Sequence, residues 1–184
     1  MPHYLAFLRG INLGKRRPEM AELRRLFERM KFKEVATFIA SGNVIFSAPT
    51  PDGAALEELI EAKLQQALGY PVDTFVRTRA EVAAVAAFRP FARPEMENPA
   101  HTVHAAFLKT ALTAGQVRQL AACRTPDDDF CAHGRELYWL CRIKTNESKA
   151  WSSPEMRALK VPTMSMRNLT TVRKLAALYP DPGA

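Results

Sequence analysis

The fold is decided by the stretch Tyr4-Leu5-Ala6-Phe7-Leu8-Arg9-Gly10-Ile11-Asn12-Leu13-Gly14-Lys15, in which an apolar run leads into a loop that contains two glycines. An unbroken apolar run of this kind predicts a strand that is buried on both faces. Gly10 and Gly14 can adopt positive φ angles, and Asn12 tolerates the left-handed region while offering both a donor and an acceptor. The stretch therefore predicts a central strand that ends in a polar loop, before a helix that begins near Pro18.

The same loop carries positive charge, which favours an anion or a polar group as its ligand. Arg9 provides a planar fork of donors, Lys15 adds formal charge, and the helix near Pro18 directs the positive end of its dipole toward the loop. Neither a P-loop nor a dinucleotide fingerprint is present. A tight strand-to-helix turn with a solvated basic rim is the alternative that the loop alone leaves open.

Length and composition are those of a globular protein of one or two domains. The chain has 184 residues, of which 47% are hydrophobic. It contains no apolar run long enough for a membrane span and no signal peptide, so we expect a cytoplasmic protein. Its three cysteines form no C-x-x-C pair, and its four histidines are scattered. We therefore expect neither a disulfide framework nor a metal site.

The net charge of +7 is unevenly distributed along the chain. Residues 1–50 carry nine Lys and Arg against four Asp and Glu, residues 51–100 carry five against eight, and residues 101–184 carry twelve against seven. A basic balance is compatible with nucleic acid, nucleotides or acidic metabolites as partners. The aromatic pattern of RNA-recognition motifs is missing from the predicted strands, which weakens an RNA-binding interpretation of the sheet.

The first half of the chain predicts the order β-α-β-β-α-β. Hydrophobic periodicity, the turn at Ser41-Gly42-Asn43 and a C-cap at Gly69 define these elements. We expect strands at residues 3–9, 34–39, 44–46 and 72–77, and helices at 18–30 and from 50 to 68. This order is typical of a ferredoxin-like, or split βαβ, unit with an antiparallel sheet.

The second half partly repeats this pattern after a proline-rich segment. Capping boxes at Thr78 and Thr113 predict the starts of two helices. We expect a strand at 102–108, a hairpin of strands 129–132 and 137–141, a short helix after Pro154, and a final helix. The predicted fold is α+β, with two ferredoxin-like subdomains at 1–88 and 102–184 and a connector at 89–101.

Two further segments combine charge with small polar side chains. Residues 144–149 include Ser148 and Lys149, and residues 163–171 include Arg167, Asn168 and Thr171. Such groups can hold a phosphate or a carboxylate. Helix capping, by Ser165 or Asn168 in the second segment, is the alternative explanation. We interpret Asp127-Asp128-Asp129 as a solvated loop, and Trp139 and Trp151 as packing residues.

Several stretches together resemble the bacterial domain-of-unknown-function family 1697 over nearly the whole chain. They are Tyr4 to Gly14, Met20-Ala21-Glu22-Leu23-Arg24, Phe38 to Phe46, Ser148-Lys149, and Arg167-Asn168 with Thr171, Val172, Lys174 and Leu175. The resemblance implies two ferredoxin-like subdomains and supplies no activity. It also implies a signature formed by Arg9, Gly10, Asn12, Gly14, Ser41, Gly42, Asn43, Ser148, Lys149, Arg167, Asn168 and Thr171. The chain departs from the family pattern at Lys15, Ala40 and Leu169.

Packing alone seldom requires Arg and Asn together in three separate loops. We therefore hypothesise that these loops converge on one cleft between the subdomains, which binds a nucleotide, a nucleic-acid backbone or a phosphorylated metabolite. The predicted ligand-binding residues are Arg9, Asn12, Lys15, Ser41, Asn43, Ser148, Lys149, Arg167, Asn168 and Thr171. One alternative is an enzyme that uses Lys149 or Ser148 in phosphoryl or acyl transfer, although no base is visible beside either. Another is a structural module in which the signature only ties the halves together. The sequence specifies no cofactor, catalytic residue or oligomeric state.

Overall fold

The computed structural model of the chain describes residues 1–11, 18–39 and 42–181. By their contacts, residues 1–84 and those from 175 onward form a first unit, and residues 85–174 form a second. The helices α3 (Arg79–Ala87) and α7 (Leu169–Leu178) each contribute residues to both units. The domain boundaries at residues 88 and 101 stay predictions.

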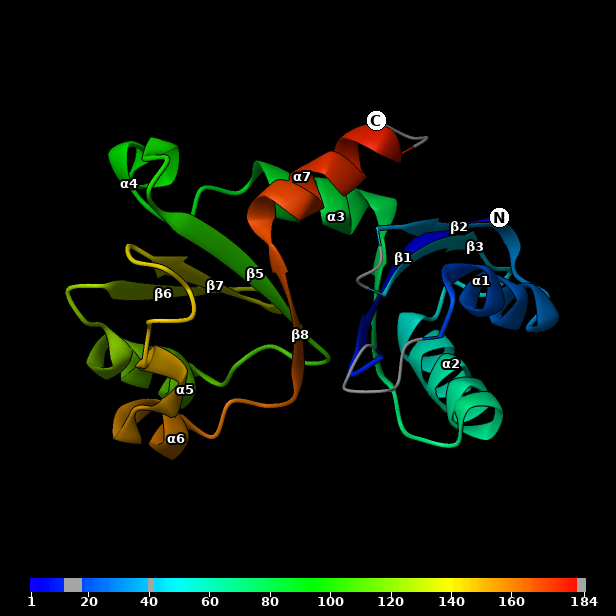
Figure 1. Cartoon of the computed structure of the whole chain (residues 1–184), viewed down its shortest axis with the longest axis horizontal. Coiled ribbons are helices and arrows are strands. Elements are labelled where there is room, and N and C mark those ends of the chain that lie inside the picture. Colours follow the sequence, from blue (N-terminus) through cyan, green and yellow to red (C-terminus); the bar gives the residue numbers. More distant parts are fainter. Residues whose placement is uncertain (12–17, 40–41, 182–184) are drawn as a thin grey trace. The chain divides into compact units, whose positions relative to one another are not determined.

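The first unit contains a four-stranded antiparallel sheet in the order β2-β3-β1-β4 (Figure 1). Its elements are β1 His3–Arg9, α1 Met20–Arg29, β2 Lys33–Phe38, β3 Asn43–Ser47, α2 Gly53–Leu68 and β4 Asp73–Thr78. β1 lies between β3 and β4, and its residues 4–8 are all buried. The apolar run at the start of the sequence is therefore a central strand, as predicted.

Two helices, α1 and α2, lie together on one side of this sheet (Figure 1). Leu23 and Phe27 of α1 and Ile60 of α2 are fully buried in the core beneath them. Leu59 of α2 has the helical spacing of a core residue, which predicts burial, but this prediction is wrong because the side chain is 40% exposed. Glu57 is buried instead, since its carboxylate faces the backbone of β4.

Three glutamates bind the backbone N–H groups along the outer edge of β4. Glu61 Oε1 accepts from the N–H of Thr74 at 2.8 Å, and Glu57 Oε1 accepts from the N–H of Val76 at 2.8 Å. The third, Glu81, belongs to the predicted capping box of α3 and accepts from the N–H of residue 78 at 2.7 Å. Carboxylates thus satisfy alternate N–H groups that no neighbouring strand reaches, which protects the edge against pairing with another chain.

The second unit contains a sheet of the same topology, in the order β6-β7-β5-β8. Its other elements include two 3₁₀ helices, η1 and η2. The bounds are α4 Arg93–Glu97, β5 Thr102–Leu108, α5 Ala114–Gln119, η1 Leu120–Cys123, β6 Asp128–His133, β7 Glu136–Cys141, η2 Ala150–Ser152, α6 Pro154–Leu159 and β8 Met164–Asn168. The hairpin, the strand at 102–108 and the capping box at Thr113 are confirmed.

Two elements differ from those expected. The helix α4 lies inside the segment 89–101, which was expected to be a connector, and the strand β8 was not expected. The sequence predicts no strand at residues 164–168, yet these residues pair with β5, with Ala105 opposite Arg167. An edge strand whose residues are mostly polar or half-buried has too few apolar positions to be recognised by periodicity. With β8 included, each unit has the complete order β-α-β-β-α-β followed by a helix.

The core of the second unit is built around aromatic side chains. Trp139 is 3% exposed, and its ring lies 5.6 Å from that of Trp151 in an edge-on arrangement. Phe130 also meets Trp151 edge-on, at 5.5 Å. Both tryptophans therefore pack, as expected. In the residues that the structure describes, no helix combines the length and the apolar character that crossing a membrane requires.

The two units repeat one another in register as well as in topology. Ala-Phe-Leu occurs at residues 6–8 of β1 and at 106–108 of β5. The N–H of Leu8 donates to the carbonyl of Gly42 at 2.8 Å, and that of Leu108 donates to the carbonyl of Arg135 at 2.9 Å. The same local geometry thus joins the first and third strands of both sheets.

Candidate functional site

Of the predicted site residues in the first unit, the structure describes Arg9 and Asn43. Arg9 ends β1, and its Nη1 lies 3.0 Å from Asp73 Oδ2 in an exposed ion pair. Asn43 begins β3, is 1% exposed, and donates through Nδ2 to the carbonyl of Phe38 at 3.2 Å. This bond closes the connection between β2 and β3, so Asn43 has a structural task. The predicted residues Asn12, Lys15 and Ser41 lie outside the described residues.

In the second unit, the hydroxyl of Ser148 is bound to a buried carboxylate. Its Oγ donates to Asp128 Oδ1 at 2.7 Å and accepts from the N–H of Ala150 at 3.2 Å. Lys149, the next residue, is exposed. Its carbonyl accepts from the N–H of Ser152 at 3.0 Å, which starts the turn η2. Ser148 therefore anchors this loop to the sheet, whereas the amino group of Lys149 lies at the surface.

Asp128 is the centre of that anchor, and its interpretation as part of a solvated loop is wrong. It lies in β6 and is 3% exposed. Besides Ser148, its carboxylate accepts from Trp139 Nε1 at 2.8 Å and from Thr125 Oγ1 at 3.0 Å. All three donors are neutral, and their hydrogen bonds satisfy a carboxylate that burial would otherwise destabilise. The sequence did not reveal this role because two of the three donors, Trp139 and Ser148, lie 11 and 20 residues further along the chain.

Arg167, Asn168 and Thr171 lie next to one another at the junction of β8 and α7. Arg167 Nη1 donates to Ser165 Oγ at 2.9 Å and to the carbonyl of Met166 at 2.8 Å. Burial lowers the pKa of Arg167 to about 10. Asn168 Oδ1 accepts from the N–H of Thr170 at 2.8 Å, so Asn168, and not Ser165, has the capping role that the sequence left open.

The predicted residues thus form local groups within each unit. Arg9 and Asn43 belong to the first, and Ser148, Lys149, Arg167, Asn168 and Thr171 to the second. Their convergence on a single cleft stays a prediction.

A different cluster of arginines surrounds a pocket within the second unit, which we call the arginine pocket. It has a volume of about 410 Å³ and is lined by Arg89, Phe91, Arg93, Met96, Glu97 and Arg173. Arg93 Nε is paired with Glu97 Oε1 at 2.7 Å, one helical turn along α4. Formal charges of three arginines and one glutamate leave the lining with +2.

The other two arginines of this pocket bind main-chain oxygens. Arg89 Nη1 donates to the carbonyl of Ala87 at 3.1 Å, and Arg173 Nε donates to that of Ala86 at 3.3 Å. Among the described residues, neither arginine has a carboxylate within ion-pair distance. Burial, and then repulsion by Arg89, lowers the pKa of Arg173 below its ordinary value. Two guanidinium groups are therefore held near the carbonyl end of α3, and no carboxylate of the described residues pairs with either.

Sequence reasoning missed this site because its arginines come from two distant segments of the chain. Arg89 and Arg93 fall in the segment interpreted as a connector, and Arg173 follows some eighty residues later inside a helix. The only available signal was the density of arginines around three prolines at residues 90–99.

Comparisons with known proteins agree with the fold and assign no activity. A family model with the description "Protein of unknown function (DUF1697)" matches residues 1–138. The sequence has no significant match among curated proteins. The structure is similar to that of the conserved bacterial protein SP0830 from Streptococcus pneumoniae, with a TM-score of 0.73 and 21% sequence identity. That similarity covers 98% of this chain and 99% of the other.

Proposed function

The chain belongs to the DUF1697 family of proteins of unknown function, and from this premise we propose that it binds an anionic ligand through Arg89 and Arg173. One observation carries the proposal: two guanidinium groups share a pocket in which no carboxylate of the described residues pairs with either. Guanidinium groups present planar forks of donors that match phosphate and carboxylate oxygens. An anion placed between them would relieve their mutual repulsion.

The net charge of the second unit also supports anion binding in that unit. Residues 85–174 hold fourteen Lys and Arg against eight Asp and Glu, which gives this unit six of the seven net positive charges. Such an excess raises the local concentration of anions around the pocket.

The lining of the pocket indicates what kind of anion fits. Its volume of about 410 Å³ is in the range of small-molecule sites. Phe91 and Met96 provide an apolar wall beside the arginines, so the ligand has an organic part as well as a charged one. A nucleotide or a phosphorylated metabolite meets both requirements.

The test uses inorganic phosphate, pyrophosphate and AMP as probes in thermal unfolding of the full chain. A ligand at ten times its Kd that binds only the folded state adds about 1.4 kcal/mol of stability, or roughly 3–6 °C in Tm for a chain of this size. We expect a saturable increase with at least one probe, and the increase should be lost in the double variant Arg89→Gln, Arg173→Gln.

The matched control is Arg118→Gln, which removes an exposed positive charge from α5 in the same unit. It should retain the increase in Tm. If the double variant and the control respond alike, or if no probe raises the Tm of the native sequence, the arginine pocket is not an anion site.

A further inference from the structure

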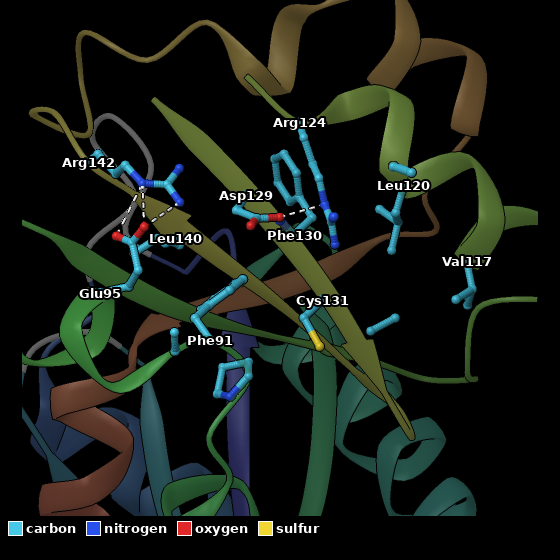
Figure 2. Close-up of a pocket in the computed structure, with 14 residues that line it drawn as sticks. Phe91, Glu95, Val117, Leu120, Arg124, Asp129, Phe130, Cys131, Leu140 and Arg142 are labelled. Atoms are coloured by element: carbon cyan, nitrogen blue, oxygen red, sulfur yellow. Dashed lines mark hydrogen bonds and ion pairs between the residues drawn. The ribbon is translucent and has the colours of Figure 1, made fainter. Parts of the chain in front are cut away.

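A second pocket in the second unit, distinct in its chemistry, lies along the free edge of β6 (Figure 2). We call it the β6-edge pocket. It has a volume of about 470 Å³, and four consecutive residues of the strand, 129–132, line it. Because β6 is the outermost strand of its sheet, it pairs with β7 on one side only. Backbone groups of β6 therefore line the pocket together with side chains.

The hairpin geometry shows which backbone groups face the pocket. His133 lies opposite Glu136 across a two-residue turn, in which Gly134 has φ 58°. Such a turn makes the closing pair a hydrogen-bonded one, and the pairs then alternate along an antiparallel ladder. The N–H and C=O groups of residues 129, 131 and 133 therefore point toward β7. Those of Phe130 and Ala132 point away from it, into the pocket.

Only part of this edge is protected. The N–H of Phe130 donates to Asp129 Oδ1 at 2.8 Å, and Asp129 is itself paired with Arg124 at 2.7 Å. Among the described residues, the carbonyl of Phe130 and both backbone groups of Ala132 have no such partner. The edge of β4, in contrast, has three successive outward N–H groups closed by glutamates. The β6 edge is therefore open over a short length.

The open edge is recessed, because side chains line the pocket from both faces of the sheet. Phe130 and Leu120 belong to the core on the helix-covered face. Side chains alternate along a strand, so Cys131 is directed to the opposite face of the sheet. His133 lies on that same face and stacks on Phe88. Phe91, three residues after Phe88, also lines the pocket. An isolated extended segment fits between such walls, whereas the edge of a second copy, recessed in the same way, is kept at a distance.

The charges around the pocket exclude a charged occupant. Arg142 holds Glu95 through contacts of 2.8 to 3.2 Å, and Arg124 holds Asp129, as the dashed lines in Figure 2 show. The lining therefore has no net charge. A charged side chain entering here would have to break one of these pairs or remain unpaired, and both outcomes are costly.

We propose that the β6 edge binds an extended, uncharged peptide segment of a partner protein as an additional strand of the sheet. The backbone of the peptide would pair with Phe130 and Ala132, and alternate side chains would contact the apolar walls, as in other cases of strand addition. This site shares Phe91 with the arginine pocket, but strand pairing at the β6 edge does not depend on an anion.

The test begins with selection from a displayed library of random octapeptides on the full chain and on the Ala132→Pro variant. Proline removes the outward N–H of residue 132 but no hydrogen bond to β7, and edge strands accept it at such positions. We expect the native chain to select uncharged peptides in which β-branched or aromatic residues alternate with others. The Ala132→Pro variant should not bind these peptides.

Cys131 supplies a direct readout with a selected synthetic peptide. It is half-buried in the pocket, whereas Cys123 and Cys141 are buried and serve as internal references. Burial, and then Asp129, raises the pKa of the Cys131 thiol, so iodoacetamide is applied at alkaline pH. At ten times the Kd, about nine-tenths of the chains are occupied, and alkylation of Cys131 should slow about tenfold.

N-methylation of the same peptide at alternate residues is the second test, and it does not depend on the folding of a variant. Methylation of the amides that face β6 should abolish protection of Cys131, and methylation of the others should not. The proposal is wrong if no peptide is enriched over the Ala132→Pro variant, or if every N-methylated peptide still binds. It is also wrong if the chain alone dimerises in sedimentation and Ala132→Pro prevents this, because the occupant would then be a second copy.

Discussion

Replacing Ser148 by Ala distinguishes a structural role of this residue from a role in chemistry. The change removes a 2.7 Å hydrogen bond to the buried carboxylate of Asp128 and leaves the N–H of Ala150 without its acceptor. A hydrogen bond to a charged group contributes about 1.5–3 kcal/mol, and a neutral one about 1 kcal/mol. Since Trp139 and Thr125 still bind the carboxylate, we expect the free energy of unfolding to fall by about 2–3 kcal/mol.

Urea unfolding followed by circular dichroism measures this difference, because a change in midpoint at constant slope reports stability. The matched control is Ser152→Ala. Ser152 is exposed and donates to the carbonyl of Lys149 at 3.0 Å, so its loss should change stability by no more than about 0.5 kcal/mol. If Ser148→Ala is as stable as the native sequence, the reasoning is refuted. That result would favour the alternative in which the Ser148 hydroxyl takes part in phosphoryl or acyl transfer.

Two further predictions concern a buried histidine and a constrained glycine. His104 stacks on Trp139 at 4.8 Å, and burial lowers its pKa below 6.5. The unfolded chain therefore takes up this proton at higher pH than the folded chain, so stability should decline as the pH falls below about 6.5. His104→Phe should reduce that decline in urea unfolding at pH 7.5 and pH 5, and an unchanged decline would contradict the assignment. Gly42 has φ +71°, and a Cβ there would lie 2.8 Å from Ile11 Cγ2. Gly42→Ala should cost about 2 kcal/mol or more, whereas Gly53→Ala, with nothing within 4 Å, should cost nothing; equal stabilities of the two variants would refute this.

Interactions between residues close in the chain were predictable in detail. Thr113 Oγ1 accepts from the N–H of Gln116 at 3.2 Å, as its capping box requires, and Gly69 ends α2 with φ 77°. The β6–β7 turn and the limits of β5 likewise agree with the sequence. Each of these features depends on groups within a few residues of one another, and local propensity decides them with little help from packing.

The misinterpreted segments are those whose state depends on distant partners. Asp128 lies in an acidic run that is typical of a solvated turn. In the fold it is buried, and its carboxylate accepts hydrogen bonds from Trp139 and Ser148. β8 is mostly polar, yet it completes the sheet because β5 leaves an edge for it to pair with.

The sequence by itself determined that the chain forms two ferredoxin-like α+β units, because hydrophobic periodicity and capping residues act locally and repeat in both halves. Only the tertiary structure decided where charge lacks a counter-charge and where a strand edge stays open. Arg173 of α7 binds the carbonyl of Ala86 in α3, which brings it to the same pocket as Arg89, and within the described part of the chain no strand or carboxylate pairs with the edge at Ala132. Such properties are set by which groups the folded chain brings together, and spacing along the chain does not encode them.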